Sequence, residues 1–258
     1  MQLSGKSAVV TGGAGGLGEG AVRALVEAGA KVVVADLADD RGKALEDAFN
    51  GEVRYVSTDV TDEDSVQAAL DAAGELGTLR VAVVVHGGHV EAGRIVGKGG
   101  PLSLDGYRKT LEHYLTGTFN VMRLAGAAMG ATAPESEGGR GVIITTASIA
   151  GLEGQTGQVA YAAAKGGVIA MTLPAARDLS IVGVRVCTIA PGTFFTPAFG
   201  RHFTEEQASA QFAQGVQFPA RMGRPVEYGQ LVRSIAENDY LNGEVIRIDG
   251  ALRFPPKG

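Results

Sequence analysis

A glycine-rich turn between an apolar run and a segment of helical periodicity is the feature that most limits how this chain can fold. Residues 7–11 are predicted to form a buried strand, and the glycine-rich turn at residues 12–18 follows directly. From residue 16 to residue 28 apolar side chains recur at helical spacing, and Gly29 is placed to end the helix. This order puts backbone N–H groups at a helix N-terminus, where a phosphate is favoured. Alone, the glycines also fit an ordinary flexible turn.

The segment after this helix supplies an acidic residue. Residues 31–36 form a second apolar run that ends in Asp36, eighteen residues after Gly18. Strand, glycine turn, helix, strand and acid form the series of a βαβ unit that binds a dinucleotide, because the carboxylate can accept hydrogen bonds from the adenosine ribose. The whole series therefore favours a dinucleotide site over a flexible turn.

The rest of the chain alternates between strand-like and helix-like segments. Strands are predicted at residues 54–57, 81–85, 141–146, 185–190 and 245–248, and a loop at 91–104. Helices are predicted at 62–73 with Thr61 as N-cap, at 104–129, and at 158–179 with a kink at Pro174. We therefore predict one α/β domain over residues 1–258, a Rossmann-type doubly wound parallel sheet of about seven strands with helices on both faces.

Composition excludes several classes of protein. A chain of 258 residues that is 45% hydrophobic suits one large core. The net charge of −5, without a Lys/Arg run, argues against a nucleic-acid or membrane surface. The single cysteine, Cys187, lies in an apolar run and is predicted to be a core residue. The N-terminus enters a strand at once and no apolar run reaches membrane-spanning length, so we expect a cytoplasmic protein.

A second stretch, residues 148–165, can assemble an acid–base site by itself. Tyr161 and Lys165 are four residues apart, so on a helix they share a face and the ammonium lies beside the phenol. A close positive charge favours phenolate and lowers the pKa of tyrosine from about 10 towards the working range. Ser148, thirteen residues before the tyrosine, can return through the loop to hold a substrate oxygen. The other interpretation is a surface pair with no catalytic role.

With these residues placed, the sequence resembles the short-chain dehydrogenase/reductase family over nearly its whole length. Its turn Thr11-Gly12-x-x-x-Gly16-x-Gly18, its pair Asp59-Val60, its Ser148, Tyr161 and Lys165 spacing and its Pro191-Gly192 turn match that family. Longer runs at 117–120, 140–144, 171–178, 188–192 and 241–251 are similar to the 3-hydroxyacyl-CoA dehydrogenase type-2 branch.

The resemblance implies an NAD-dependent enzyme that interconverts a secondary alcohol and a ketone, with a 3-hydroxyacyl-CoA as the expected substrate. It implies that Ser148 bonds the reacting oxygen, that Tyr161 exchanges its proton, and that Lys165 lowers the pKa of Tyr161 and holds the nicotinamide ribose. It also implies a homotetramer paired through the two long helices. The implied cofactor-binding residues are Thr11, Gly12, Gly16, Leu17, Gly18, Asp36, Leu37, Asp59, Val60, Gly87, Gly88, Tyr161, Lys165, Pro191 and Gly192.

Two departures from the family pattern fall near the expected site. Val85-His86-Gly87-Gly88 stands where the family has Asn-Asn-Ala-Gly, so the amides are lost. Tyr114 stands where the family has a catalytic Asn whose carbonyl and an ordered water connect the lysine to solvent. The phenol can fill the water's position, relay protons itself or weaken turnover. The alternatives are therefore an altered dehydrogenase, a dehydrogenase for a steroid or another alcohol, and a weakly active NAD-binding scaffold.

Other residues allow more than one interpretation. His86 and His89 lack further ligands nearby, so no metal is predicted. Six phenylalanines lie in a segment around residues 193–220, which is predicted to be a substrate lid. They can form a wall for an acyl chain, pack the lid, or fill a subunit interface. Arg201, His202 and Arg221 can meet CoA phosphates or only keep the surface soluble.

The residues after the second strand predict the choice of cofactor. Asp36 is followed by Leu37 and Ala38 rather than by basic residues. A carboxylate here repels the 2′-phosphate of NADP and accepts from the 2′-hydroxyl of NAD, a difference that can reach several kcal/mol. Calorimetric titration should therefore give a clearly smaller Kd for NADH than for NADPH. Comparable constants would contradict this prediction.

Overall fold

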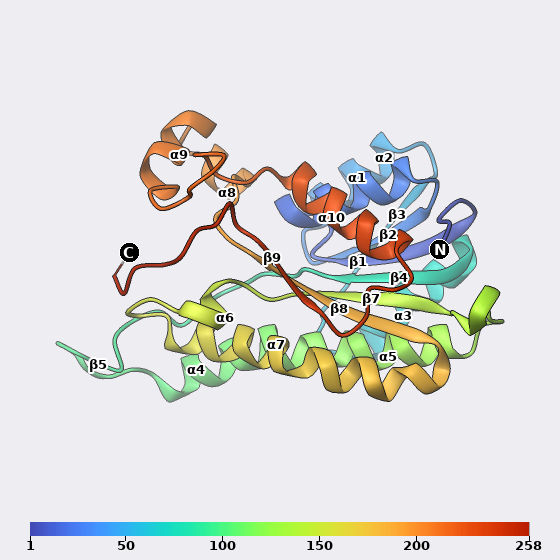
Figure 1. The fold of residues 1–258 in the computed structure, drawn as a ribbon, viewed down its shortest axis with the longest axis horizontal. Coiled ribbons are helices and arrows are strands. Elements are labelled where there is room, and N and C mark those ends of the chain that lie inside the picture. Colours follow the sequence, from blue (N-terminus) through green and yellow to red (C-terminus); the bar gives the residue numbers. More distant parts are fainter. Residues whose placement is uncertain (258) are drawn as a thin grey trace.

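The central feature of the fold is one parallel sheet whose carboxyl ends all face the same edge. The structure is a computed structural model that describes residues 1–257. The sheet has seven strands in the order β3-β2-β1-β4-β7-β8-β9, and every pairing is parallel (Figure 1). This confirms the predicted doubly wound sheet. The strands are β1 (Lys6–Thr11), β2 (Lys31–Asp36), β3 (Val53–Ser57), β4 (Thr78–Val84), β7 (Gly141–Thr146), β8 (Val184–Pro191) and β9 (Val245–Ile248).

Helices cover both faces of the sheet, and each face has its own hydrophobic core (Figure 1). Along β1, Ala8 and Val10 belong to one core and Val9 to the other, as the two-residue period of a strand requires. Cys187 is fully buried in the first core, as predicted. One face carries α1 (Gly16–Glu27), α2 (Asp39–Ala48) and α10 (Pro225–Glu237), and the other α3 (Glu63–Leu76), α5 (Gly117–Gly130) and α7 (Val159–Leu179).

The helix predicted at residues 104–129 is not continuous. It consists of α4 (Leu104–Leu111), a π-helical turn (Glu112–Thr116) and α5. π-Helical turns occur often at functional sites, and this one contains Tyr114.

The predicted N-cap of α3 was wrong by one residue. The Asp62 carboxylate accepts from the backbone N–H of Ser65 at 2.7 Å and caps the helix. The Thr61 hydroxyl instead donates to Asp59 at 2.7 Å, and Thr61 does not cap the helix. The sequence motifs also did not indicate α2, α10, the short helix α6 (Ala150–Glu153), or the hairpin of β5 (Val96–Gly97) and β6 (Gly100–Pro101) in the loop after β4.

The segment predicted to be a lid contains α8 (Pro197–Gly200) and α9 (Glu205–Phe212) and stands beside the sheet (Figure 1). Its aromatic rings mostly pack on one another and on Met222. Of the three roles considered for these rings, packing of the lid itself is therefore supported. Phe218 differs, since 85% of its surface is exposed.

One helical stretch among the described residues, Val159–Val182, is long and apolar enough to cross a membrane by length and composition, so the expectation that no apolar run reaches this length was wrong. It contains the buried Lys165 and packs on β8, so it serves here as a covering helix of the sheet.

Two glycines let α1 and α10 cross at close range. A Cβ added at Gly229 would lie 2.1 Å from the carbonyl oxygen of Gly20. Gly229→Ala should therefore lower the free energy of unfolding by about 1–3 kcal/mol, because backbone would have to move. Gly74→Ala is the matched control: nothing lies within 4 Å of its added Cβ in α3, and it should stabilise by up to about 1 kcal/mol. Urea unfolding measures both values, and equal effects would contradict the close-crossing argument.

Candidate active site

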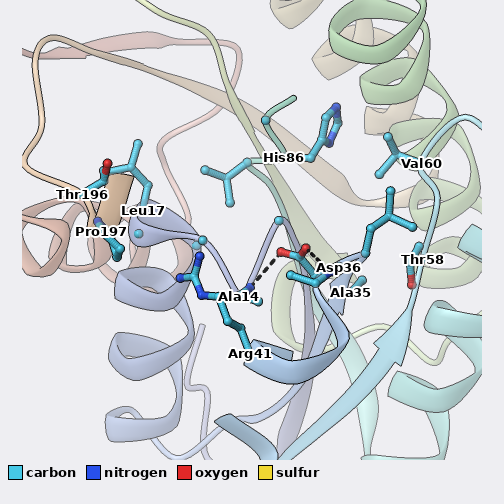
Figure 2. A pocket seen from close by; sticks show the side chains of 18 of the residues that line it. Ala14, Leu17, Ala35, Asp36, Arg41, Thr58, Val60, His86, Thr196 and Pro197 are labelled. Carbon is cyan, nitrogen blue, oxygen red and sulfur yellow. Dashed lines mark hydrogen bonds between the residues drawn. The ribbon is translucent and has the colours of Figure 1, made fainter. Parts of the chain in front are cut away.

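A pocket of about 380 Å³ opens at the carboxyl ends of β1, β2 and β4 (Figure 2). Most of the predicted cofactor residues of the first βαβ unit line it, together with Val60 and Gly87. Thr196 and Pro197, at the start of α8, reach it and face Asp36 across the opening, a long-range approach that no local motif indicated (Figure 2). The predicted residues on its wall are Gly12, Gly16, Leu17, Gly18, Asp36, Leu37, Val60 and Gly87; the predicted Thr11, Asp59, Gly88, Tyr161, Lys165, Pro191 and Gly192 lie off this wall.

The glycine turn is compressed against its neighbours. Gly12 has a positive φ of 66°, and a Cβ there would lie 2.6 Å from the Cα of His86. A Cβ at Gly18 would lie 2.0 Å from the carbonyl oxygen of Gly12. Only glycine fits at these two positions, and the N-terminus of α1 therefore opens directly onto the pocket. This cradle fits the phosphates of a dinucleotide.

Asp36 is fixed at the side of this pocket by two backbone donors. Its Oδ2 accepts from the N–H of Ala14 and its Oδ1 from the N–H of Ala38, both at 3.0 Å (Figure 2). Each carboxylate oxygen retains a lone pair, so ribose hydroxyls can still donate to it. Asp59 is used differently: it accepts from the N–H and the hydroxyl of Thr61 and shapes its own loop.

The three predicted catalytic side chains meet next to the end of β7. Ser148 follows this strand, and α7 carries Tyr161 and Lys165 one turn apart. The Lys165 ammonium is buried and donates to the carbonyl of Thr146 at 2.7 Å. Lys165 is only 4% exposed, so the surface-pair interpretation was wrong.

The pKa values of this group differ from the sequence-based expectation. Burial raises the pKa of Tyr161 to about 12; the neighbouring Tyr114 adds to the rise, and a hydrogen bond from Ser148 opposes it. The expected lowering by Lys165 does not dominate, because burial also lowers the pKa of Lys165 to about 7 and its ammonium points to Thr146. The phenol is therefore protonated at neutral pH in this structure.

Comparison with known proteins agrees with this geometry. A family model described as short chain dehydrogenase matches residues 6–207. The chain is 46% identical to human 3-hydroxyacyl-CoA dehydrogenase type-2, covering 98% of this chain and 97% of that protein. It is 44% identical to the Drosophila melanogaster protein of the same name, covering 96% and 97%. A crystal structure of 3-hydroxyacyl-CoA dehydrogenase type-2 from Mycobacterium avium has a TM-score of 0.94 and 53% identity over 99% of both chains.

The chain belongs to the short-chain dehydrogenase family. It is thus an oxidoreductase that acts on CH–OH groups with a nicotinamide cofactor. The glycine cradle and the oriented Asp36 carboxylate fit such a cofactor.

In this short-chain dehydrogenase Tyr114 presents its ring, not its hydroxyl, to Tyr161 and Lys165. The Tyr114 ring centroid lies 4.9 Å from Lys165 Nζ and 5.4 Å from the Tyr161 ring, nearly perpendicular to it. Its hydroxyl accepts from the N–H of Gly88 and donates to the carbonyl of Gly88, each at 2.8 Å. Burial raises the pKa of Tyr114, so the phenol stays protonated. The hydroxyl thus fastens the loop after β4.

The His86 side chain makes hydrogen bonds in the segment where the family's amide side chains are missing. Its Nε2 lies 3.0 Å from the carbonyl of His113, which can only accept, so Nε2 carries the proton. Nδ1 then accepts from the Thr11 hydroxyl at 3.2 Å. The imidazole therefore provides one donor and one acceptor, a role that the sequence motifs did not indicate. His89 lies exposed on the same loop, and no group of three or more metal-binding side chains occurs within residues 1–257.

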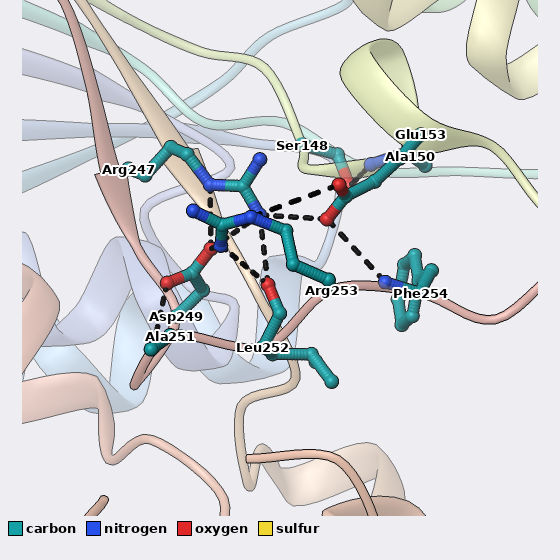
Figure 3. Close-up of polar contacts among 9 residues, drawn as sticks. All are labelled: Ser148, Ala150, Glu153, Arg247, Asp249, Ala251, Leu252, Arg253 and Phe254. Carbon is teal, nitrogen blue, oxygen red and sulfur yellow. Dashed lines mark hydrogen bonds and ion pairs between the residues drawn. The ribbon is translucent and has the colours of Figure 1, made fainter. Parts of the chain in front are cut away.

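An ion-pair network joins the C-terminal segment to the helix after Ser148 (Figure 3). Arg247 donates to Glu153 of α6 and to Asp249, both at 2.6 Å. Asp249 packs so closely on the Pro191-Gly192 turn that a Cβ at Gly192 would lie 2.8 Å from the Cβ of Asp249. Three parts of the chain beside the reaction centre are therefore held together, which local sequence patterns did not predict.

The buried imidazole predicts a pH-dependent stability. Burial, followed by the charges of Lys165 and His113, lowers the pKa of His86 from 6.5 to about 3, while the hydrogen bond to the His113 backbone and the charge of Asp59 oppose this. Between these values the unfolded chain binds a proton that the folded chain does not, so stability is lost as pH falls from 6.5.

His86→Asn should therefore flatten the fall in Tm between about pH 6.5 and pH 4.5, where one such group contributes up to about 1.4 kcal/mol per pH unit. Differential scanning calorimetry measures this fall, with the exposed His89→Asn as control. Parallel curves for wild type and His86→Asn would contradict the assignment.

Proposed function

We propose that this short-chain dehydrogenase interconverts 3-hydroxyacyl-CoA and 3-ketoacyl-CoA, with NAD as its cofactor. The observation that carries the proposal is the meeting of Ser148, Tyr161 and buried Lys165 beside a pocket with a glycine cradle. The acyl-CoA substrate is supported by the names of the human and fly relatives, which span nearly the same length.

The proposed chemistry follows from the three side chains. A bound nicotinamide supplies the hydride acceptor or donor at its C4 atom. In the oxidation direction the Tyr161 oxygen, after losing its own proton, takes the hydroxyl proton of the substrate, while the Ser148 hydroxyl holds the reacting oxygen. In the reverse direction the Tyr161 phenol donates its proton to the ketone oxygen. Because its pKa is raised, the phenol is ready as an acid at neutral pH, and oxidation should be favoured as pH rises.

NAD is proposed over NADP because the carboxylate of Asp36 is held at the pocket side by Ala14 and Ala38. A fixed negative charge is unfavourable for a 2′-phosphate. Arg41 also lines the pocket, but its side chain is exposed to solvent, which screens its charge.

Of the three side chains considered for contacts with CoA phosphates, one is already engaged in an ion pair. Arg221 forms a two-pronged ion pair with Glu227, with distances of 2.9 and 2.7 Å, so its charge is already neutralised. Arg201 and His202 remain candidates for phosphate contacts. Phe218 is the lid ring placed to meet an apolar group from outside, since 85% of its surface is exposed.

The direct test is NADH consumption with acetoacetyl-CoA by wild type and by Tyr161→Phe. The variant removes only the hydroxyl, so kcat should fall by about 10²- to 10⁴-fold while the Kd for NADH changes little. Retained activity in the variant would exclude Tyr161 as the acid–base group. NADH binding without turnover on acyl-CoA or steroid substrates would favour the weakly active scaffold.

We also propose a homotetramer. The helices α5 and α7 expose Phe119 to 51% and Leu173 to 46%, and only a third of the most apolar window of the α7 segment is buried within one chain. Such apolar helix faces suit symmetric pairing. Multi-angle light scattering at micromolar concentration should give the mass of four chains, and a monomer would contradict the proposal.

A further inference from the structure

Three side chains at or next to the two departures in the sequence form a series of contacts in the structure. His86 comes from the loop after β4, and His113 and Tyr114 from the π-helical turn. We call these three residues the aromatic brace. Each hydrogen-bonds to backbone of the opposite segment: His86 to the His113 carbonyl at 3.0 Å, His113 to the Gly87 carbonyl at 2.8 Å, and Tyr114 to both backbone groups of Gly88. The loop after β4 and the π-helical turn are thus held together by side chains from both segments.

The rings of the brace also form a continuous series. The ring centroids of His86 and His113 are 5.3 Å apart, and those of His113 and Tyr114 are 5.2 Å apart. Tyr114 in turn lies 5.4 Å from Tyr161. The interplanar angles are 77°, 86° and 88°, which is the edge-to-face arrangement that aromatic rings prefer. The series therefore ends at the proposed acid–base residue.

The other end of the brace touches the cofactor turn. His86 accepts from the hydroxyl of Thr11, and the backbone of His86 is the surface against which Gly12 is compressed. His86 and His113 both line the cofactor pocket. One set of contacts thus runs from the cofactor turn to Tyr161 and Lys165.

Two consecutive side chains of the π-helical turn bind the same loop. In a regular α-helix, neighbouring residues point in directions about 100° apart. Here His113 and Tyr114 both reach the loop, at Gly87 and Gly88. This π-helical turn, of a kind that is frequent at functional sites, therefore carries two side chains that hold the loop after β4.

We propose that the aromatic brace is a positioning unit, which holds residues 85–88 against the cofactor turn and sets the place of the Tyr114 ring beside Tyr161 and Lys165. None of the three residues transfers a proton or touches the reacting atoms in this role. Because they share one loop, the loss of one weakens the hold of the others. The inference rests on the proposed function only for the substrate used in the turnover assay.

The test is a double-mutant cycle with His113→Val, Tyr114→Phe and the double variant. His113→Val removes the bond to Gly87, and Tyr114→Phe removes the bonds to Gly88 but keeps the ring. Each single change should raise the Kd for NADH by about 5-fold and lower kcat with acetoacetyl-CoA by about 10-fold. The double variant should show a loss well below the product of the two single losses, because the first change already frees the loop.

The controls separate positioning from stability. His89→Val removes an exposed imidazole from the same loop and should leave both Kd and kcat unchanged. Circular dichroism and Tm show whether each variant is folded at the assay temperature. A purely structural role would lower Tm while Kd and kcat of the folded variants stayed at wild-type values, and that result would overturn the inference. Multiplicative losses in the double variant would overturn the claim of one unit.

The NADH titration needs no substrate, so it decides the inference even if wild type fails to turn over acetoacetyl-CoA. That failure would count against the proposed function alone. If Tyr114→Phe or His113→Val does not fold, His113→Gln, which keeps a donor for the Gly87 carbonyl, replaces the deletion in the same titration. It should retain NADH affinity within about 2-fold, and a loss as large as that expected for His113→Val would overturn the proposal.

Discussion

Close approach of backbone to backbone at the carboxyl edge of the sheet is the constraint on which the site depends. Gly12 lies against His86, Gly18 against Gly12, and Gly192 against Asp249, at separations that leave no room for a Cβ. These contacts bring the first, fourth and last strands of the sheet to one place. The donors of the cofactor turn and the catalytic helix can therefore face one another across a short distance.

Burial then determines the charges available for chemistry. Burial lowers the pKa values of Lys165 and His86 and raises that of Tyr161, so it shifts each of the three groups towards its neutral form. A neutral His86 does not repel the lysine ammonium nearby, and it can donate and accept at once. In place of the lost amides the site thus has a side chain that donates one hydrogen bond and accepts another.

The parallel sheet and the meeting of Ser148, Tyr161 and Lys165 follow from local periodicity and spacing, because parallel strands place their following loops at one edge. The direction of the Tyr161 pKa was not predictable in this way, since it depends on how much chain covers the phenol. The π-helical turn, the binding of the Tyr114 hydroxyl to Gly88 and the approach of Thr196 likewise depend on tertiary contacts. Asp62 replaced Thr61 as N-cap because a nearby carboxylate had already engaged the threonine.

The ion pairs among Glu153, Arg247 and Asp249 have a consequence for the order in which the molecule is completed. The cofactor pocket is built mostly from the first ninety residues, whereas the support of the Ser148 helix comes from residues almost a hundred positions further on. Contacts between such distant positions form late, because the intervening chain must first be ordered. A chain still lacking its final strand would therefore have most of its nucleotide pocket before Ser148 is secured.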